Sequence, residues 1–310
     1  TPLGVIEWFV YLLAAVMFVI GLHLMNSPKT ARKGNMVSAI GMVFAVAMAF
    51  IVLFAVEASN GFKHGVAVIV LIVGIVIGAV AGVVSAKKVK MTDMPQLVSV
   101  FNTVGGGAAA LVALNDILTK EGTPDIVVLI TAGLGILIGS VTFTGSLIAA
   151  GKLQGIKWVK KLTLPGKGVW NILFAVLSVA SLVMLCVQPE QRLLWSILTT
   201  VFALCYGLVF VIPIGGADMP GGISVLNACT GTAVAMSGLA IDNVALIVAG
   251  ALVGSAGVTL SILMAQAMNR PLLSVLAGGF GGGLINGSVK QSAVTNLNSV
   301  TGVNYVGGFI

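Results

Sequence analysis

The sequence predicts an all-α polytopic membrane protein with about nine transmembrane helices. Of its 310 residues 58% are apolar and only 8% are charged, and the mean hydropathy is +1.13. Soluble domains have roughly 45–50% apolar and about 25% charged residues. The 16 basic and 9 acidic side chains are too few to cover a water-facing globule of this size. The composition therefore excludes a soluble enzyme and a disordered linker.

Nine apolar stretches are long enough to cross a bilayer, whose hydrocarbon core of about 30 Å requires about 20 helical residues. Charged residues, prolines and glycines separate the stretches. The predicted spans are 5–25, 36–56, 65–86, 96–117, 125–150, 168–188, 193–213, 221–240 and 242–268.

The basic residues test this span count, because short cytoplasmic loops carry an excess of Lys and Arg. With nine spans, 13 of the 16 basic residues fall on the side of the C-terminal tail, and the other side holds Lys63, Lys120 and Arg192. We therefore expect the N-terminus outside and the C-terminus in the cytoplasm. The net charge of +7 is divided among short loop clusters, which does not favour nucleic acid as a partner.

Two pairs of spans resemble each other and predict an internal repeat. Asp93-Met94-Pro95 precedes Asn102 at the same spacing at which Asp218-Met219-Pro220 precedes Asn227. The span that follows carries Gly-Ser and then Thr in each case, at Gly139, Ser140 and Thr142 and at Gly254, Ser255 and Thr259. Four spans separate the copies, so spans 4–5 and 8–9 should form a parallel rather than an inverted repeat.

Asp93 and Asp218 each open a predicted helix, and two interpretations of them stay open. An Asp before Met-Pro can accept hydrogen bonds from free backbone N–H groups at a helix start. Alternatively, the two acids collect protons or contact a partner at the cytoplasmic mouth. Asp218 is the stronger candidate for that role, because its own loop contains no Lys or Arg.

Two amides and a hydroxyl are predicted to lie at one depth in the membrane. At ~1.5 Å per residue, Asn102 and Asn227 lie about 10 Å, and Ser146 about 9 Å, from the cytoplasmic face. Unsatisfied amides are costly in hydrocarbon, so these groups should face one another or water. They form either an interhelical hydrogen-bonded clamp or a hydrated proton path. No charged residue is predicted near the middle of any span.

Small residues at four-residue spacing predict close helix packing. They occur as Gly74, Gly78 and Gly82, as Gly135 and Gly139, and as Gly250 and Gly254.

At several of these motifs the sequence resembles the membrane domain of the beta subunit of proton-translocating nicotinamide nucleotide transhydrogenase. The resemblance extends from about residue 5 to Phe280. The segments that carry it are 91–95, 139–146, 215–220, 250–255 and 267–270, which read MTDMP, GSVTFTGS, GGADMP, GALVGS and AMNR.

The resemblance implies a function and a set of sensitive residues. In that family, hydride passes between NAD(H) and NADP(H) in soluble domains while protons cross the membrane domain. By motif position, the proton pathway would include Asn102, Ser146, Asn227 and Asp218, and coupling or gating would involve Asp93, Ser255, Gly257 and Arg270. Asn102 stands where many members have a membrane-embedded histidine, so the titrating group must lie elsewhere. A histidine from another subunit and Asp218 are the two candidates.

The resemblance also implies partners and a location. These are an alpha subunit with membrane helices and an NAD-binding domain, an NADP-binding domain, a homodimer of the assembled complex, and the bacterial inner membrane. Residues 1–280 are the predicted transmembrane domain and 281–310 a Gly-, Ser- and Asn-rich tail of unknown role. We expect no soluble NADP-binding domain, no catalytic residue for hydride transfer and no cofactor or metal in this chain, since it lacks G-x-G-x-x-G between a strand and a helix and Cys/His pairs at ligand spacing.

Two other functions compete with this interpretation. A secondary transporter could bind its substrate between spans 4 and 8, as parallel repeats allow. A purely structural membrane scaffold is the second. The repeat region lacks the charged substrate contacts that are usual in transporters.

Overall fold

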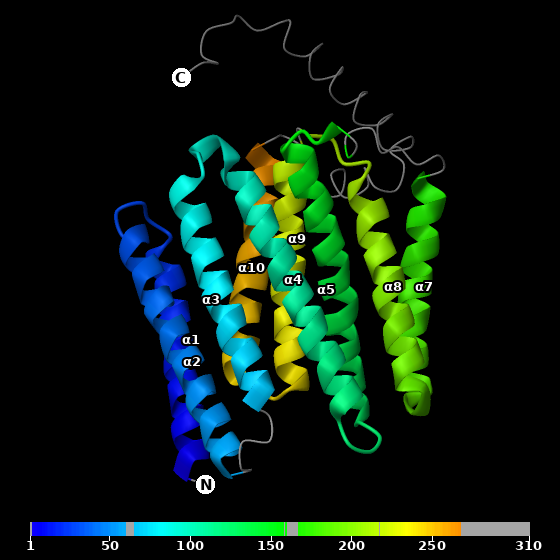
Figure 1. Cartoon of the computed structure of the whole chain (residues 1–310). Helices are drawn as coiled ribbons and strands as arrows, with labels where there is room; N and C mark the ends of the chain where they lie inside the picture. Colours follow the sequence, from blue (N-terminus) through cyan, green and yellow to red (C-terminus); the bar gives the residue numbers. More distant parts are fainter. Residues whose placement is uncertain (1, 60–64, 158, 160–166, 217, 268–310) are drawn as a thin grey trace, which may run out of the picture.

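The computed structural model describes residues 2–59, 65–157, 159, 167–216 and 218–267, and within them nine helices are long and apolar enough to cross a membrane (Figure 1). They agree with the nine predicted spans to within a few residues at each end. Two short 3₁₀ turns, η1 (Met91–Asp93) and η2 (Pro189–Gln191), precede two of them. The helices are α1 (Pro2–Leu24), α2 (Ala31–Ser59), α3 (Gly65–Lys88), α4 (Met94–Thr119), α5 (Ile126–Leu153), α7 (Lys167–Val187), α8 (Arg192–Val211), α9 (Met219–Ala240) and α10 (Val244–Ala267).

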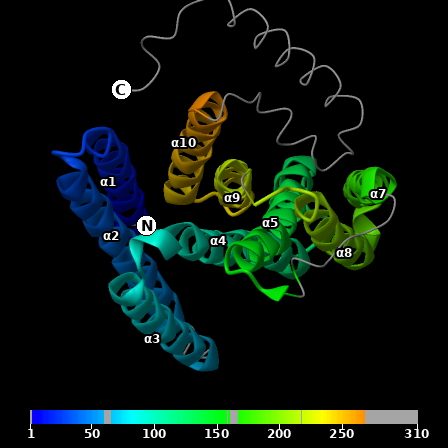
Figure 2. The same cartoon turned by 90° about the horizontal axis from the view of Figure 1, so that it is seen from above.

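The helices run up and down, so that successive helices are antiparallel (Figure 1). Viewed from above, α4, α5, α9 and α10 occupy the middle, with α1 and α2 on one side and α7 and α8 on the other (Figure 2). Of the described helices α9 is the most deeply buried and α3 the least. Helices α4 and α9 begin at the same end of the bundle, directly after Asp93 and Asp218.

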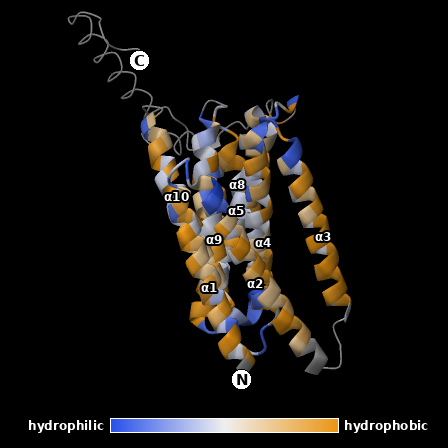
Figure 3. Ribbon diagram, turned by 90° about the vertical axis from the view of Figure 1, so that its left-hand side faces the viewer, coloured by the Kyte–Doolittle hydropathy of each residue, from blue (hydrophilic) through white to orange (hydrophobic). Residues whose placement is uncertain are grey.

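The bundle has large apolar side chains outside and small or polar ones inside. Figure 3 shows α3, at the edge of the bundle, as hydrophobic along most of its length. Ile77 and Leu263, for example, are 63% and 56% exposed, whereas Ser140 and Thr142 are buried. This distribution suits a protein surrounded by lipid, because hydrocarbon solvates Ile and Leu and leaves close packing and hydrogen bonds to hold the helices together.

Two pairs of glycines allow close helix crossings in the middle of the bundle. A Cβ at Gly106 of α4 would overlap the backbone of Gly139 in α5, and a Cβ at Gly231 of α9 would overlap the backbone of Gly254 in α10. Only glycine allows these approaches. The predicted stripe on α3 behaves differently, because Gly74, Gly78 and Gly82 have nothing within 4 Å of an added Cβ. Close packing of that stripe is therefore a wrong expectation for the described chain, in which α3 stands apart (Figure 2).

The starts of α4 and α9 correct one expectation about the two acids. Asp93 and Asp218 occupy the N-cap positions, but neither side chain accepts a capping hydrogen bond. Their backbones lie at φ −101°, ψ 4° and at φ −91°, ψ −6°, away from the extended conformation of most N-caps. Asp125, which is extended at φ −61°, ψ 150°, does accept a bond of 2.7 Å, from the N–H of Ile126.

The predicted repeat has counterparts among the contacts. Ser99 and Ser224 each stand six residues after their Asp, and each donates a hydrogen bond to a carbonyl oxygen of the next helix, that of Ser146 in α5 and that of Gly257 in α10. The two glycine crossings also fall at equivalent positions of the two helix pairs. The two acceptor carbonyls differ by about one helical turn in register, because Ser146 stands seven residues after Gly139 and Gly257 three residues after Gly254. The repeat itself therefore stays a prediction.

Candidate functional site

Asn102 and Ser146 meet inside the bundle, between α4 and α5. The Nδ2 of Asn102 donates to the Oγ of Ser146 at 2.8 Å, and the Oγ of Ser99 donates to the backbone carbonyl of Ser146 at 2.8 Å. Asn102 is 6% exposed, while Ser99 and Ser146 are fully buried. Asn102 and Ser146 were predicted to lie at one depth, and in the structure they are in direct contact. With Ser99 they form a buried polar cluster that joins α4 to α5.

Two buried oxygens beside this cluster have no hydrogen-bond partner among the described residues. They are the Oδ1 of Asn102 and the Oγ1 of Thr230 on α9. The methyl group of Thr230 lies 3.3 Å from the position of a Cβ on Gly105, one turn of α4 beyond Asn102. Buried polar groups are nearly always hydrogen-bonded, to ordered water where protein is absent. The interface between α4 and α9, here called the α4–α9 seam, therefore has two buried oxygens that suit hydrogen bonds to water.

Asn227 lies at the level of this cluster but is not hydrogen-bonded to it. Its neighbour Leu226 packs against Gly145, directly beside Ser146. Its other neighbour, Ala228, packs against Gly257 of α10. Since successive residues are separated by about 100° around a helix, half-buried Asn227 lies between the face of α9 that contacts α5 and the face that contacts α10. The structure thus joins two of the three residues that were predicted to share one depth.

The loop that carries Asp218 is held by a lysine from another helix. Lys152, at the end of α5, donates from Nζ to the carbonyl oxygens of Val211 (3.2 Å), Ile212 and Ile214 (2.9 Å). These carbonyls end α8 and begin the segment that leads to half-buried Asp218. The sequence shows no Lys or Arg within this loop, and the structure adds a cation that reaches the loop from α5.

The three described residues among the four predicted for coupling or gating do not come together in one site. Asp93 is half-buried at the end of η1. Gly257 contacts α9 through Ala228, and its carbonyl oxygen accepts a hydrogen bond of 3.2 Å from Ser224. Ser255 faces the other way, into a cavity of about 520 Å³ between α1 and α10 that His23 also lines. Arg270 lies outside the described residues, as does the tail 281–310.

Thr230 and Lys152 are the residues that the sequence interpretation missed as parts of the site. Thr230 carries a weak signal, being a hydroxyl three residues after Asn227 on the same helix. No sequence signal points to Lys152, because its hydrogen-bond partners lie about 60 residues away along the chain.

The fold and this polar cluster define a class: a polytopic helical membrane protein whose central helices are joined by buried amides and hydroxyls. Within that class, residues 7–305 match the family model described as NAD(P) transhydrogenase beta subunit, so the chain belongs to this family. The match runs past Phe280, where the resemblance noted in the sequence ends.

Curated relatives agree with the family match. Two proteins named NAD(P) transhydrogenase subunit beta, both from Rhodospirillum rubrum, are each 40% identical to this chain over 278 residues. The matched region covers 87% of this chain and 57% of each relative. The chain thus spans little more than half the length of the relatives.

Proposed function

We propose that this chain is the proton-translocating membrane domain of a nicotinamide nucleotide transhydrogenase. In this role it couples hydride transfer between NAD(H) and NADP(H), carried out in partner soluble domains, to proton movement across the membrane. Family membership supports the enzyme class. The buried cluster of Asn102 and Ser146, with the unpaired oxygens of Asn102 and Thr230 beside it, is the observation that carries the proton role.

The polar cluster suits a water path better than a simple clamp. A clamp would satisfy its own polar atoms, because a buried unpaired oxygen costs about 1–3 kcal/mol. Here the Oδ1 of Asn102 is available to accept, and the hydroxyl of Thr230 to donate or accept, in the same seam. Amides and hydroxyls can hold a chain of water molecules without titrating near neutral pH.

The titrating group is supplied by a partner. Coupling requires a site that changes protonation, and histidine does so near a pKa of about 6.5. We place that histidine on a membrane helix of an alpha subunit, beside α4 and within one water molecule of Asn102. The isolated chain is then a poor proton conductor. The alternative is that Asp218 alone takes and releases the proton from the cytoplasmic side.

The orientation follows the basic residues, with the N-terminus outside and the C-terminus in the cytoplasm of a bacterial inner membrane. Asp218 and Lys152 then lie at the cytoplasmic end. Cysteine labelling of Lys157 and Glu121 positions tests this proposal: Lys157 should be reached from the cytoplasm and Glu121 from outside, and the opposite result would reverse the topology.

The nucleotides belong to other domains in this proposal. The described residues form helices and 3₁₀ turns, without the strand–turn–helix that holds a dinucleotide phosphate. The partners are therefore an alpha subunit with membrane helices and an NAD-binding domain, and an NADP-binding domain. The assembled complex is proposed to be a homodimer.

The decisive experiment measures nucleotide-driven proton transport by the full complex in sealed vesicles. Replacing the partner's histidine should abolish transport, whereas Asp218→Asn should lower it less. If the histidine variant pumps normally and Asp218→Asn does not, the carboxylate at the mouth is the titrating group. Nucleotide exchange without any proton movement in the unmodified complex would overturn the proposed function.

A secondary transporter with its site between spans 4 and 8 is less well supported. The corresponding helices, α4 and α9, contact each other directly where Thr230 meets Gly105 and where the Oγ of Ser237 donates to the carbonyl of Ala109 at 2.9 Å. Along the stretch from Gly105 to Ala109 these contacts leave little room between the two helices for a substrate larger than water.

A further inference from the structure

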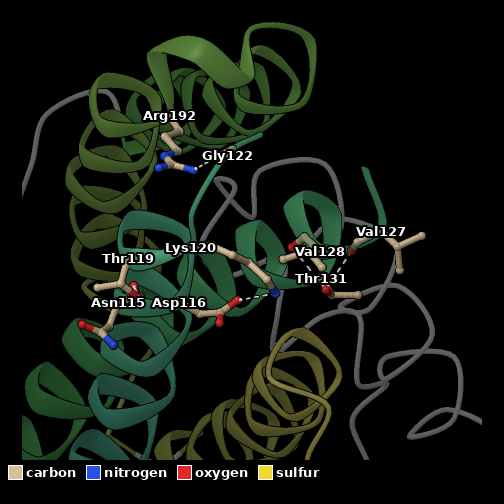
Figure 4. A network of polar contacts seen from close by, with 9 residues as sticks. All are labelled: Asn115, Asp116, Thr119, Lys120, Gly122, Val127, Val128, Thr131 and Arg192. Carbon is tan, nitrogen blue, oxygen red and sulfur yellow. Dashed lines mark hydrogen bonds and ion pairs between the residues drawn. The ribbon is translucent and has the colours of Figure 1, made fainter. Parts of the chain in front are cut away.

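A carboxylate lies at the far end of α4, opposite the end that carries Asp218. Asp116 has a side chain that is 19% exposed, and its Oδ2 lies 3.6 Å from the Nζ of Lys120, one turn further along the same helix (Figure 4). That oxygen is buried and has no hydrogen-bond donor among the described residues. The ion pair is thus too long to be a hydrogen bond, and the carboxylate retains the capacity to accept a proton or a water molecule.

Asp116 lines an open cavity at the surface of the bundle. The cavity has a volume of about 440 Å³ and lies between the end of α4 and the end of α9. Its lining residues are Leu111, Val112, Asn115, Asp116, Thr119 and Ile241. A carboxylate, an amide and a hydroxyl therefore line a space large enough for several water molecules, each of which occupies about 30 Å³ in the liquid.

The cavity lies along the same seam as the buried cluster. Asp116 follows Asn102 by 14 residues, which is about 21 Å along α4 at ~1.5 Å per residue. Thr230 meets α4 one turn beyond Asn102, and Ser237 meets it at Ala109, so α9 supplies a hydroxyl at two levels between them. Asp116 marks the end of this seam.

An ordinary surface ion pair does not explain these features together. A pair at i and i+4 on an exposed helix contributes about 0.3–0.5 kcal/mol and needs neither a buried oxygen nor a cavity. The neighbouring cation at this end, Arg192, is already engaged, since it donates to the carbonyl of Gly122 at 2.7 Å and holds the α4–α5 loop against the start of α8 (Figure 4). Lys120 is therefore the cation beside Asp116.

We propose that Asp116 is the proton-exchange group at the outer end of the path, where it passes protons between outside water and the α4–α9 seam. This role rests on the proposed function and adds an outer group to it. A hydronium ion protonates the carboxylate and leaves as water. Transfer of that proton to a water molecule in the seam then restores the carboxylate, and the reverse order serves outward movement.

Three variants of the full complex in sealed vesicles test this role. Asp116→Asn should lower nucleotide-driven proton transport by about a hundredfold, the smaller end of what a positioned acid or base contributes. Asp116→Glu retains a carboxyl group and should restore at least half of the transport. Lys120→Met removes the ammonium but keeps the carboxylate, and should leave transport within about twofold of the unmodified complex.

The outcomes separate this proposal from the alternatives. Normal transport by Asp116→Asn, or no rescue by Asp116→Glu, overturns it. Equal losses in Lys120→Met and Asp116→Asn would assign the pair a structural role instead. Failure of the proposed function is distinct, because the unmodified complex would then move no protons at all.

A measurement on the unmodified complex guards against a folding defect in the variants. Treatment with a hydrophobic carbodiimide, followed by mass spectrometry, gives the fraction of Asp116 that is modified. Transport should fall in proportion to that fraction. Complete modification of Asp116 with transport unchanged would contradict the proposal.

Discussion

The hydrogen bond between Asn102 and Ser146 should show a measurable coupling energy. It is buried and 2.8 Å long, and the Oδ1 of Asn102 has no donor among the described residues. Interhelical hydrogen bonds in membrane proteins average about 0.6 kcal/mol and reach about 1.7 kcal/mol. Since loss of Ser146 Oγ leaves the whole amide without a protein partner, we expect a value in the upper part of this range, about 1–1.5 kcal/mol.

The assay is a double-mutant cycle of Asn102→Ala and Ser146→Ala, with unfolding of the assembled complex followed in mixed detergent micelles. The matched control is the cycle of Ser99→Ala with Ser146→Ala. Ser99 bonds to the backbone carbonyl of Ser146, which alanine retains, so this cycle should show no coupling. A coupling energy below about 0.3 kcal/mol between Asn102 and Ser146, the usual value for independent sites, would refute the reasoning.

Two further substitutions test the packing and the loop. Gly231→Val should destabilise the complex by about 1–3 kcal/mol, because the added Cβ overlaps the backbone of α10. Gly78→Val should be near neutral, because a Cβ there meets nothing within 4 Å. Thermal unfolding of the two variants compares their stability. Lys152→Met should speed amide exchange at residues 212 and 214–216, because it removes charge-assisted bonds worth about 1.5–3 kcal/mol each. Lys157→Met, at an exposed position, should not change this exchange, and equal exchange in both variants would rule out a role of Lys152 in holding the loop.

The number and ends of the helices could be predicted from the sequence, because a bilayer of fixed thickness imposes one length on every span. Which helices pack against one another could not be predicted. Gly135, Gly139 and Gly74 have the same kind of spacing, yet only the first two pack closely. Hydropathy predicts that a helix lies in lipid, but it does not indicate which face of that helix contacts another helix. The separate position of α3 could therefore not be predicted from the sequence.

For the candidate site, the sequence predicted the depth of a residue in the membrane but not the direction in which its side chain points. The rise per residue placed Asn102 and Ser146 at one depth, and they are hydrogen-bonded. It placed Asn227 at that depth too, but depth does not specify rotation about the axis of α9. The contact of Lys152 with the end of α8 depends on the pairing of α5 with α8, which no local pattern encodes.

The most direct test of proton movement through the central cluster is nucleotide-driven proton transport by the full complex carrying Asn102→Leu, a change that keeps the size of the side chain and removes its amide. Thr103→Val is the matched control, because Thr103 is equally buried but bonds only to the carbonyl of Ser99 in its own helix. We expect Asn102→Leu to abolish most of the transport, whereas Thr103→Val should retain most of it. Full transport by Asn102→Leu would contradict a proton path at this residue.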